Sequence, residues 1–259
     1  MWVAIVGLGG TGSIVAQQLA HLGVRKFLLI DRDKIEETNL NRTVGATRAD
    51  IGCTKVEIAK RMIRAIQPDS DVRAIAGDVV DEKHARELLG VGFVFSCTDS
   101  HASRHLLNQL CYQYVVPMID MGVAIDTSDT VRFAGHVKAL APGLACLWCM
   151  GNLNPKQIRL EMMSPEQRQA DPYFQGTGRV IQPAVISINS TVASAAVTMF
   201  LSMVAGLDAP SRLLVYDGNR QRLAAVTAEP DPACNFCGPA STALTGDQSP
   251  LPVRRNASS

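Results

Sequence analysis

The sequence has no excess of charge of either sign and no long uninterrupted apolar run. It contains 25 Lys and Arg residues against 24 Asp and Glu residues. This balance gives no electrostatic reason to expect a nucleic acid or a membrane surface as a partner. Gln182, Pro183 and Asn189 interrupt the most apolar stretch, residues 180–207. That stretch lacks the roughly 18 consecutive apolar residues that a membrane span needs, so we expect a buried helix.

The N-terminal residues do not have the composition of a secretory signal. Met1 leads directly into the apolar residues 2–6, with no basic segment and no cleavage site. We therefore expect a cytoplasmic protein, in which the seven cysteines are thiols or metal ligands rather than disulfides. A chain of 259 residues with 47% hydrophobic residues can form one large α/β domain.

Short apolar strands alternate with helical segments in the first half of the chain. Residues 3–6 and 26–31 read as buried strands around a helix at 13–22, which gives a βαβ unit of about 30 residues. Further elements are expected, in order, as helix 55–66, strand 72–76, helix 82–89, strand 93–97, helix 101–114 and strand 116–121. This alternation predicts a Rossmann-like, doubly wound, mostly parallel sheet.

The pattern changes after Gly122. Residues 123–140 predict one or two β-segments, and 212–217 with 223–227 predict a hairpin, so the C-terminal strands are expected to be antiparallel. Polar residues 152–177 contain three prolines and are expected to form a long crossover loop. We divide the chain into a nucleotide-binding half (1–122), a second part with the crossover loop, helix and hairpin (123–238), and a disordered tail rich in Ser, Thr, Pro and Ala (239–259).

A glycine-rich loop, Gly7-Leu8-Gly9-Gly10-Thr11-Gly12, follows the first strand. Its glycines let phosphates approach the backbone, and the helix that follows offers N–H groups at its N-terminus. Asp31, which ends the second strand, can accept hydrogen bonds from ribose hydroxyls. By itself the loop fits an NAD site as well as an ATP site, and a tight strand-to-helix turn is the structural alternative.

Three later motifs favour ATP. They are residues 31–42, which run from Asp31 to Arg42; residues 52–57, which contain Lys55; and Cys97-Thr98-Asp99-Ser100, with Arg104 and Asn108 on the next helix. In this order they resemble the signature of the ThiF/MoeB/HesA-type, ubiquitin E1-like adenylyltransferase family. The resemblance covers about residues 2–238.

The resemblance implies a site for ATP and Mg²⁺. Its implied catalytic residues are Arg42 on the β- and γ-phosphates, Lys55 beside the α-phosphate and Asp99 on Mg²⁺. Its implied nucleotide-binding residues are Gly7, Gly9, Gly10, Gly12, Asp31, Asp33, Thr38, Asn39, Asn41, Arg42, Lys55, Asp99 and Ser100. The alternatives are that Arg42 and Lys55 are solvated surface charges and that Asp99 caps helix 101–114. Arg104 is expected to be a structural ion-pair partner.

The implied chemistry agrees with these residue types. A carboxylate nucleophile is already ionised at neutral pH, so its attack on the α-phosphorus needs no general base. Negative charge develops on the phosphate oxygens as pyrophosphate leaves. Fixed cations and a metal ion directed at that charge stabilise the transition state.

Two CxxC pairs, Cys146 with Cys149 and Cys234 with Cys237, predict a metal site. Four thiolates are the usual ligands of a tetrahedral structural zinc ion, and the family resemblance also implies zinc at both pairs. The site would tie the crossover region to the C-terminal hairpin. Two redox dithiols or free buried thiols are the alternatives.

Two departures from the family pattern bear on the reaction. Residues 151–177 contain no cysteine, although many family members use a cysteine there to accept the acyl group. Cys53, Cys97 and Cys111 are more consistent with core residues than with nucleophiles. We therefore expect the reaction to stop at the acyl-adenylate or to pass the acyl group to a partner's cysteine. The sequence also begins at the first strand, without the family segment that sends an arginine to a neighbour's ATP site. Another subunit, a missing N-terminal region or an internal arginine is expected to fill that role, or the activity is expected to be weak.

By resemblance, the protein is expected to be a homodimeric ATP-dependent adenylyltransferase. Its expected substrate is the C-terminal glycine of a small ubiquitin-like or sulfur-carrier protein, with an E2-like protein or another acceptor downstream. No nucleic acid or membrane partner is expected. The alternatives are a peptide or tRNA-base carboxylate as substrate, an E1-like binding scaffold with incomplete chemistry, and an NAD-dependent oxidoreductase, which leaves Arg42, Lys55 and Asp99 unexplained.

Overall fold

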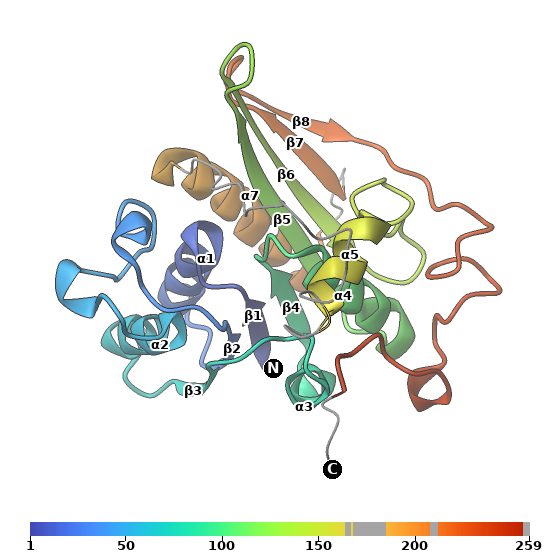
Figure 1. The fold of residues 1–259 in the computed structure, drawn as a ribbon, viewed down its shortest axis with the longest axis horizontal. Helices are drawn as coiled ribbons and strands as arrows, with labels where there is room; N and C mark the ends of the chain where they lie inside the picture. Colours follow the sequence, from blue (N-terminus) through green and yellow to red (C-terminus); the bar gives the residue numbers. More distant parts are fainter. Residues whose placement is uncertain (164–166, 168–184, 208–211, 256–259) are drawn as a thin grey trace.

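The computed structural model describes residues 1–163, 167, 185–207 and 212–255. Eight strands form one sheet in the order β3-β2-β1-β4-β5-β6-β7-β8 (Figure 1). The first five pair in parallel, and they are β1 Val3–Val6, β2 Lys26–Ile30, β3 Asp71–Ile75, β4 Phe93–Ser96 and β5 Met118–Asp126. Antiparallel pairing continues from β5 through β6 Arg132–Leu140, β7 Leu213–Asp217 and β8 Arg222–Val226. The predicted Rossmann-like, mostly parallel sheet with antiparallel C-terminal strands is confirmed.

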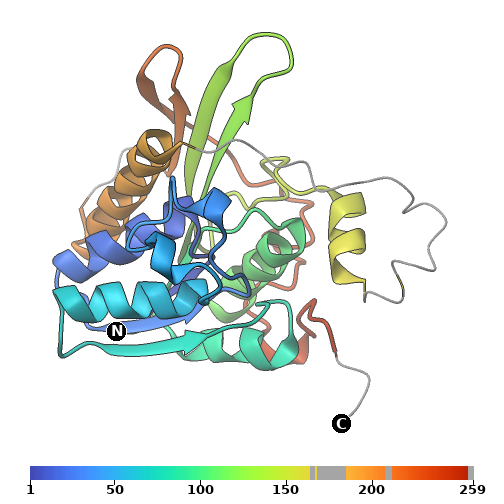
Figure 2. The ribbon, with the colours of Figure 1, turned by 60° about the vertical axis from the view of Figure 1, so that its left-hand side comes forward.

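Helices cover both faces of the sheet, as Figures 1 and 2 show. One face packs against α1 Gly10–His21, α2 Lys55–Ile66 and α7 Ile186–Val204. The other packs against α3 Glu82–Glu87 and α4 His101–Tyr114, and α5 Pro155–Met162 packs on α4. The apolar residues on the two sides of the strands therefore form two separate cores, as expected for a parallel sheet that is buried on both faces.

The second half of the chain differs from prediction in two elements. The strand expected at 116–121 extends to Asp126, because β6 pairs with it residue by residue from Leu140 to Arg132. The expected crossover loop contains a helix, α5, which begins where Asn154 accepts hydrogen bonds from the backbone N–H groups of Lys156 and Gln157. An Asn cap followed by a proline in the first turn is a strong helix start. Residues 164–166 and 168–177 of that loop, and residues 180–184 of the expected helix 180–207, lie outside the described residues.

The prediction of a disordered tail is wrong for residues 239–255. This segment, which we name the strap, runs along α4 to α3 and is red in Figure 1. Two buried glutamines of α4 donate hydrogen bonds to its backbone: Gln113 to the carbonyl oxygens of Gly246 and Ser249, and Gln109 to that of Pro250. The composition of the strap suggested disorder, because the side chains that hold its backbone belong to α4 and are not visible in the sequence of the strap itself. Residues 256–259 lie outside the described residues.

Among the described residues, one helix, α7, is long and apolar enough by length and composition to cross a membrane. In this structure α7 packs against α1, β5 and β6. Its buried residues include Val192, Ala193 and Ala196, which belong to the core on that face. The expectation of a helix with a buried face is therefore confirmed for Ile186–Val204.

Candidate active site

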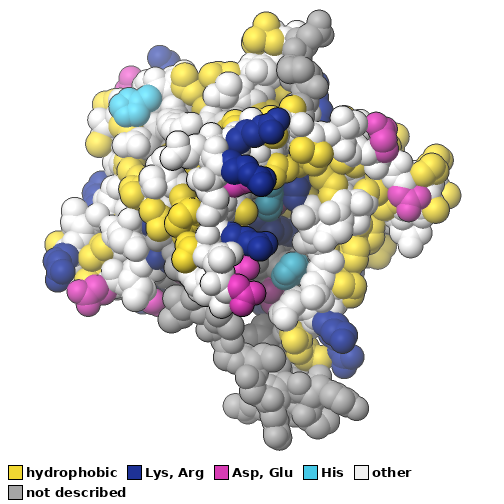
Figure 3. Space-filling view, turned by 90° about the horizontal axis from the view of Figure 1, so that it is seen from above, with side chains coloured by type: hydrophobic (Ala, Val, Ile, Leu, Met, Phe, Trp, Pro, Cys, Tyr) yellow, Lys and Arg dark blue, Asp and Glu magenta, His cyan; other side chains and the backbone are white. Residues whose placement is uncertain are grey.

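A cleft of about 1450 Å³ opens at the carboxyl ends of the parallel strands. Its wall includes the ends of β1 and β2 and the residues that follow β4. Because β1 lies between β2 and β4, the chain order reverses here, and ligands of open parallel sheets bind at such a point. Figure 3 shows this face of the molecule hollowed at its centre, with Lys, Arg and His side chains around the hollow.

The glycine loop forms one wall of the cleft, and its conformation requires glycine. Gly7 has a φ of +88°, and a Cβ on it would lie 2.6 Å from the Cys97 carbonyl oxygen. A Cβ on Gly12 would lie 1.9 Å from the Gly7 carbonyl oxygen, so this glycine lets α1 pack closely on the loop. Gly9, in contrast, has no atom within 4 Å of its Cβ position and lines the open cleft. The loop is therefore open for a phosphate at the N-terminus of α1.

Asp31 fixes this loop from the end of β2. Its two carboxylate oxygens accept the backbone N–H groups of Leu8, at 2.6 Å, and of Asp33, at 2.7 Å. Burial raises the pKa of Asp31 above its usual value, although the charge of Lys55 and the two N–H groups act in the opposite direction. Asp31 also lines the cleft, so it can bind a ribose hydroxyl with its remaining lone pairs. Its ribose role stays a prediction.

Two predicted cations, Arg42 and Lys55, line the same cleft. The Lys55 Nζ atom lies 2.9 Å from Asp33 Oδ2, and the side chain is only 10% exposed. An Arg42 Nη1 hydrogen is donated to the Thr38 carbonyl oxygen, and the same nitrogen lies 3.1 Å from Asn41 Oδ1. The partly buried ion pair of Lys55 is unlike a solvated surface charge, whereas the hydrogen bonds of Arg42 are exposed and lie within its own turn.

Four residues of the predicted nucleotide set do not line the cleft: the buried Gly12 and the three residues Thr38, Asn39 and Asn41. Thr38, Asn39 and Asn41 lie close together in the chain. They form the short turn around η1 Glu37–Asn39. The buried Asn39 accepts the Glu36 N–H with its side chain and the Arg42 N–H with its backbone carbonyl. In this structure the turn orients Arg42.

Asp99 and Ser100 lie in the loop between β4 and α4, and both line the cleft. Ser100, rather than Asp99, is the N-cap of α4, because its Oγ atom accepts the Ser103 N–H at 3.1 Å. The alternative that Asp99 is the cap is therefore wrong. The Asp99 side chain is exposed at the cleft, where it can meet a metal ion.

The far end of the cleft contains charged residues that the sequence analysis did not place in the site. Asp120, fully buried on β5, accepts a hydrogen bond from Ser96 Oγ at 2.8 Å and lies 3.2 Å from Arg104 Nε and 3.3 Å from His136 Nε2. Lys138, opposite Asp120 on β6, is also buried. The sequence signal that could have identified this cluster was the presence of charged residues inside predicted strands. The expectation that Arg104 is a structural ion-pair partner is confirmed.

The pKa values of this cluster follow from burial and mutual charge. Burial alone would raise the pKa of Asp120, but Arg104, His136 and Lys138 together hold it below its usual value. Burial lowers the pKa of Lys138 to about 8, against the opposing effect of Asp120. Burial also lowers the pKa of His136. One carboxylate therefore compensates two buried cations.

We expect Asp120→Asn to lower the free energy of unfolding by about 3–5 kcal/mol, because it leaves Arg104 and Lys138 as buried charges without compensation. Urea unfolding at pH 7 measures this. The matched control, Asp129→Asn, replaces an exposed aspartate in the β5–β6 turn and should change stability by less than about 0.5 kcal/mol. Equal stability of the two variants would contradict the assigned role of Asp120.

Two further residues at the cleft come from the second half of the chain. Asn189, on α7, lies against the glycine loop, since a Cβ on Gly10 would be 2.1 Å from its Nδ2 atom. The sequence signal for it was a single Asn in an apolar helix. Glu161, on α5, accepts hydrogen bonds from Ser100 Oγ at 2.6 Å and from the Ala102 N–H at 2.7 Å. Nothing in its sequence neighbourhood indicated this contact, which joins α5 to the N-terminus of α4.

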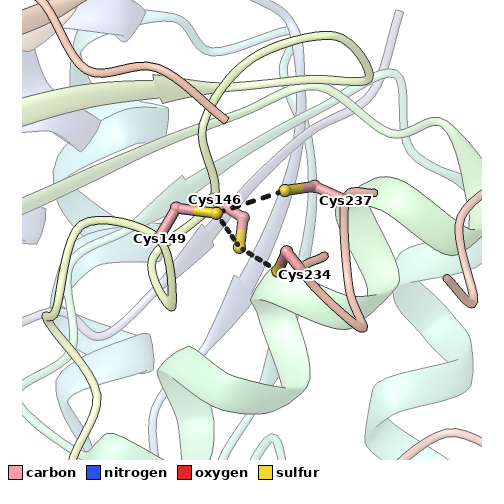
Figure 4. A group of neighbouring side chains, drawn as sticks. All are labelled: Cys146, Cys149, Cys234 and Cys237. Atoms are coloured by element: carbon pink, nitrogen blue, oxygen red, sulfur yellow. Dashed lines mark hydrogen bonds between the residues drawn. The ribbon is translucent and has the colours of Figure 1, made fainter. Parts of the chain in front are cut away.

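The four cysteines of the two CxxC pairs converge on one point (Figure 4). Their Sγ atoms all lie within 4.8 Å of one another, and three pairs are separated by 3.4, 3.6 and 3.7 Å. Tetrahedral zinc with Zn–S bonds of about 2.3 Å separates its sulfur ligands by roughly 3.8 Å. The cluster therefore fits a four-coordinate metal ion and closes it off from solvent ligands.

The three remaining cysteines do not show the features of an activated thiol. Cys97 lines the cleft, but burial raises the pKa of its thiol far above the usual value, as it does for Cys111 inside α4. The expectation that Cys53 is a core residue is wrong, because its side chain is exposed, and it is not among the residues that line the cleft. A reactive cysteine needs a lowered pKa together with access to the substrate.

Comparison with known proteins agrees with this geometry. The model of the ThiF family matches residues 1–236. The chain is 29% identical over 237 residues to the SAMP-activating enzyme E1 of Haloferax volcanii, covering 91% of this chain and 80% of that protein. It is 25% identical over 242 residues to the sulfur carrier protein ThiS adenylyltransferase of Escherichia coli, covering 91% of this chain and 85% of that protein.

A solved structure, Escherichia coli MccB with ATP, has the same fold, with a TM-score of 0.71 at 21% identity. The match covers 92% of this chain and 66% of MccB. Because the family match spans nearly the whole described fold and the relatives are activating enzymes and adenylyltransferases, the chain belongs to the ThiF family and is an ATP-dependent adenylyltransferase of carboxylates.

Proposed function

We propose that the protein adenylates the C-terminal glycine carboxylate of a small ubiquitin-like or sulfur-carrier protein. The observation that supports this substrate class is the form of the cleft. Its nucleotide end continues along one face of β5, β6 and β7, where the apolar side chains of Ala124, Ala134, Leu213 and Val215 lie next to His136 and Lys138. These residues lie on one face of the sheet, where an extended tail can reach the nucleotide while a globular domain stays outside. The names of the two relatives, which act on SAMP and ThiS, support the same class.

The proposed roles of the cleft residues follow from their charges. ATP supplies the phosphorus that the substrate carboxylate attacks and pyrophosphate as the leaving group. Lys55, held by Asp33, stabilises negative charge at the α-phosphate, and Arg42 stabilises the departing phosphates. Asp99 provides a carboxylate for Mg²⁺, an ion that proteins commonly hold with one or two carboxylates plus the phosphates of the substrate. The four clustered cysteines provide the structural zinc site.

The adenylate is proposed to be the last intermediate formed on this chain. Among the described residues, Cys97 is the one cysteine that lines the cleft, and its raised pKa opposes a role as nucleophile. Residues 151–177 contain no cysteine. The acyl group would then pass to a thiol of a downstream protein, such as an E2-like acceptor.

ATP–pyrophosphate exchange tests the proposal. Small ubiquitin-like proteins encoded in the same genome are compared, each with its terminal glycine, without that glycine, and as a C-terminal amide. We expect exchange only with the free glycine carboxylate, because the amide lacks an ionised nucleophile. Exchange with Cys97→Ser should match the wild type.

Exchange that is equal with the amide would contradict adenylation of the carboxylate. Exchange only with peptides or with tRNA would favour the alternative substrates, and ATP binding without any exchange would favour the scaffold. The homodimer and the cytoplasmic location stay predictions.

A further inference from the structure

The strap (residues 239–255) ends at a side chain that joins two walls of the cleft. Near this end, the Arg254 N–H donates to the Val80 carbonyl oxygen at 2.7 Å, and Arg254 forms a parallel bridge with Asp81. The Arg254 backbone is thereby fixed against the loop between β3 and α3.

The Arg254 guanidinium contacts two separate segments. Nη1 lies 3.4 Å from Asp78 Oδ2 and 3.3 Å from Asp81 Oδ1 on the β3–α3 loop. Nη2 donates a 2.9 Å hydrogen bond to the Glu161 carbonyl oxygen on α5. The side chain is 24% exposed, so these charge-assisted contacts are only partly screened by solvent.

On the loop side, these contacts lead to the nucleotide end of the cleft. Asp78 lines the cleft and lies 2.7 Å from Arg32 Nη1. Arg32 lies 3.9 Å from Asp33, which in turn lies 2.9 Å from Lys55. A continuous series of opposite charges therefore connects Arg254 to Lys55. The Gly77 N–H, next to Asp78, donates to the Asp31 carbonyl oxygen at 3.2 Å.

On the α5 side, the contacts of Arg254 lead to the end of the cleft that contains Asp99, the proposed Mg²⁺ ligand. The carbonyl oxygen of Glu161 binds Arg254, and its carboxylate binds Ser100 and the Ala102 N–H. Ser100 follows Asp99 directly. Arg254 therefore restrains α5. The last turn of α5 in turn contacts the loop that contains Asp99.

We propose that Arg254 is a positioning residue for ATP binding: it fixes the Asp78 loop and α5 relative to each other and so keeps the two walls of the nucleotide cleft at the correct separation. The proposal rests on the proposed nucleotide role of this cleft. An arginine suits the position because its planar group offers several donors in fixed directions. A lysine, with one compact ammonium group, cannot reach acceptors on both segments with the same geometry.

The test compares Arg254→Ala with Arg255→Ala by isothermal titration of ATP·Mg²⁺. Arg255 is the matched control, because it is the adjacent arginine, is 70% exposed and makes only a 3.9 Å contact with Glu82. We expect Arg254→Ala to weaken ATP binding roughly three- to tenfold, the usual size of an effect transmitted through such a network. Arg254→Lys should restore part of the affinity, and Arg255→Ala should bind like the wild type.

Hydrogen exchange of the same variants distinguishes positioning from general destabilisation. Arg254→Ala should exchange faster at residues 77–81 and 155–162, and ATP should protect both segments less than in the wild type. In a double-mutant cycle with Asp78→Asn, the combined loss of ATP affinity should be smaller than the sum of the two single losses, because the residues act through one contact.

Unchanged ATP affinity in Arg254→Ala would overturn the proposal, even if the melting temperature falls. Additive losses in the cycle would also overturn it. ATP binding by the wild type without carrier-dependent exchange would contradict the proposed substrate but leave this inference intact. Absence of ATP binding by the wild type would overturn both.

Discussion

Arg42→Ala is expected to lower the rate of ATP–pyrophosphate exchange by about 10²–10³-fold, the usual effect of removing one fixed transition-state donor. Arg42 lines the cleft beside the glycine loop, where a Cβ on Gly10 would lie 3.4 Å from its Cδ atom. In the proposed mechanism, a cation at that place stabilises charge on the departing phosphates. Exchange is measured at a saturating concentration of the carrier protein, so that a lower rate reports a slower chemical step rather than weaker binding of the carrier.

The fold should tolerate this change, because the hydrogen bonds of the Arg42 side chain are partly exposed and local. The free energy of unfolding should therefore change by less than about 1 kcal/mol. Arg48→Ala is the matched control: Arg48 belongs to the same region, is 84% exposed and pairs with an exposed Glu37. Exchange that survives Arg42→Ala, or falls equally in Arg48→Ala, would show that Arg42 is not a catalytic residue.

Loss of the metal site is expected to have the largest effect on stability. The apparent binding free energy of structural zinc in small peptides is on the order of 10 kcal/mol at neutral pH. Cys237→Ser, or a strong chelator, should therefore unfold the region around the cysteines and lower the melting temperature. Purified wild-type protein should contain one zinc ion per chain by elemental analysis.

Trp148 reports this unfolding directly. Its ring stacks on Phe236 with centroids 5.4 Å apart and an angle of 7° between planes, so it bridges the two CxxC segments. Its fluorescence should shift to longer wavelength when the zinc is removed. Cys53→Ser, a change at an exposed cysteine, is the control. A metal-free protein with full stability would leave the cysteines as free thiols and contradict the zinc site.

Local sequence was sufficient for the parallel half of the fold. The strands β1, β2 and β4 are nearly continuous apolar runs, and α2 has a clear helical period in Val56, Ala59 and Ile63. Such periodicity depends only on neighbours in the chain. The glycine loop was equally readable, because Gly7 and Gly12 meet steric conditions that only glycine satisfies.

Segments fixed by distant partners were less predictable. The strap resembles a disordered tail in composition, and its order depends on Gln109 and Gln113 of α4. In the crossover stretch, the Asn154–Pro155 start signal was local, but the contact between Glu161 and Ser100 joins residues 61 positions apart. Hydropathy and secondary-structure propensity are local properties, so they carry no information about contacts between residues this far apart in the chain.

The family pattern can be recognised from the order of the residues alone: a glycine loop, then Arg42, Lys55 and Asp99, and two CxxC pairs. The spacing of the cysteines predicts the metal site, whereas the roles of Arg42, Lys55 and Asp99 are implied by the family resemblance. The folded structure was needed to show that Asn39 orients Arg42, that Ser100 caps α4, and that Asp120 compensates two buried cations. It also showed that Arg254 bridges two walls of the cleft. The physical reason is that burial and electrostatic pairing depend on distances in space, which strand order and helix packing set after the local elements have formed.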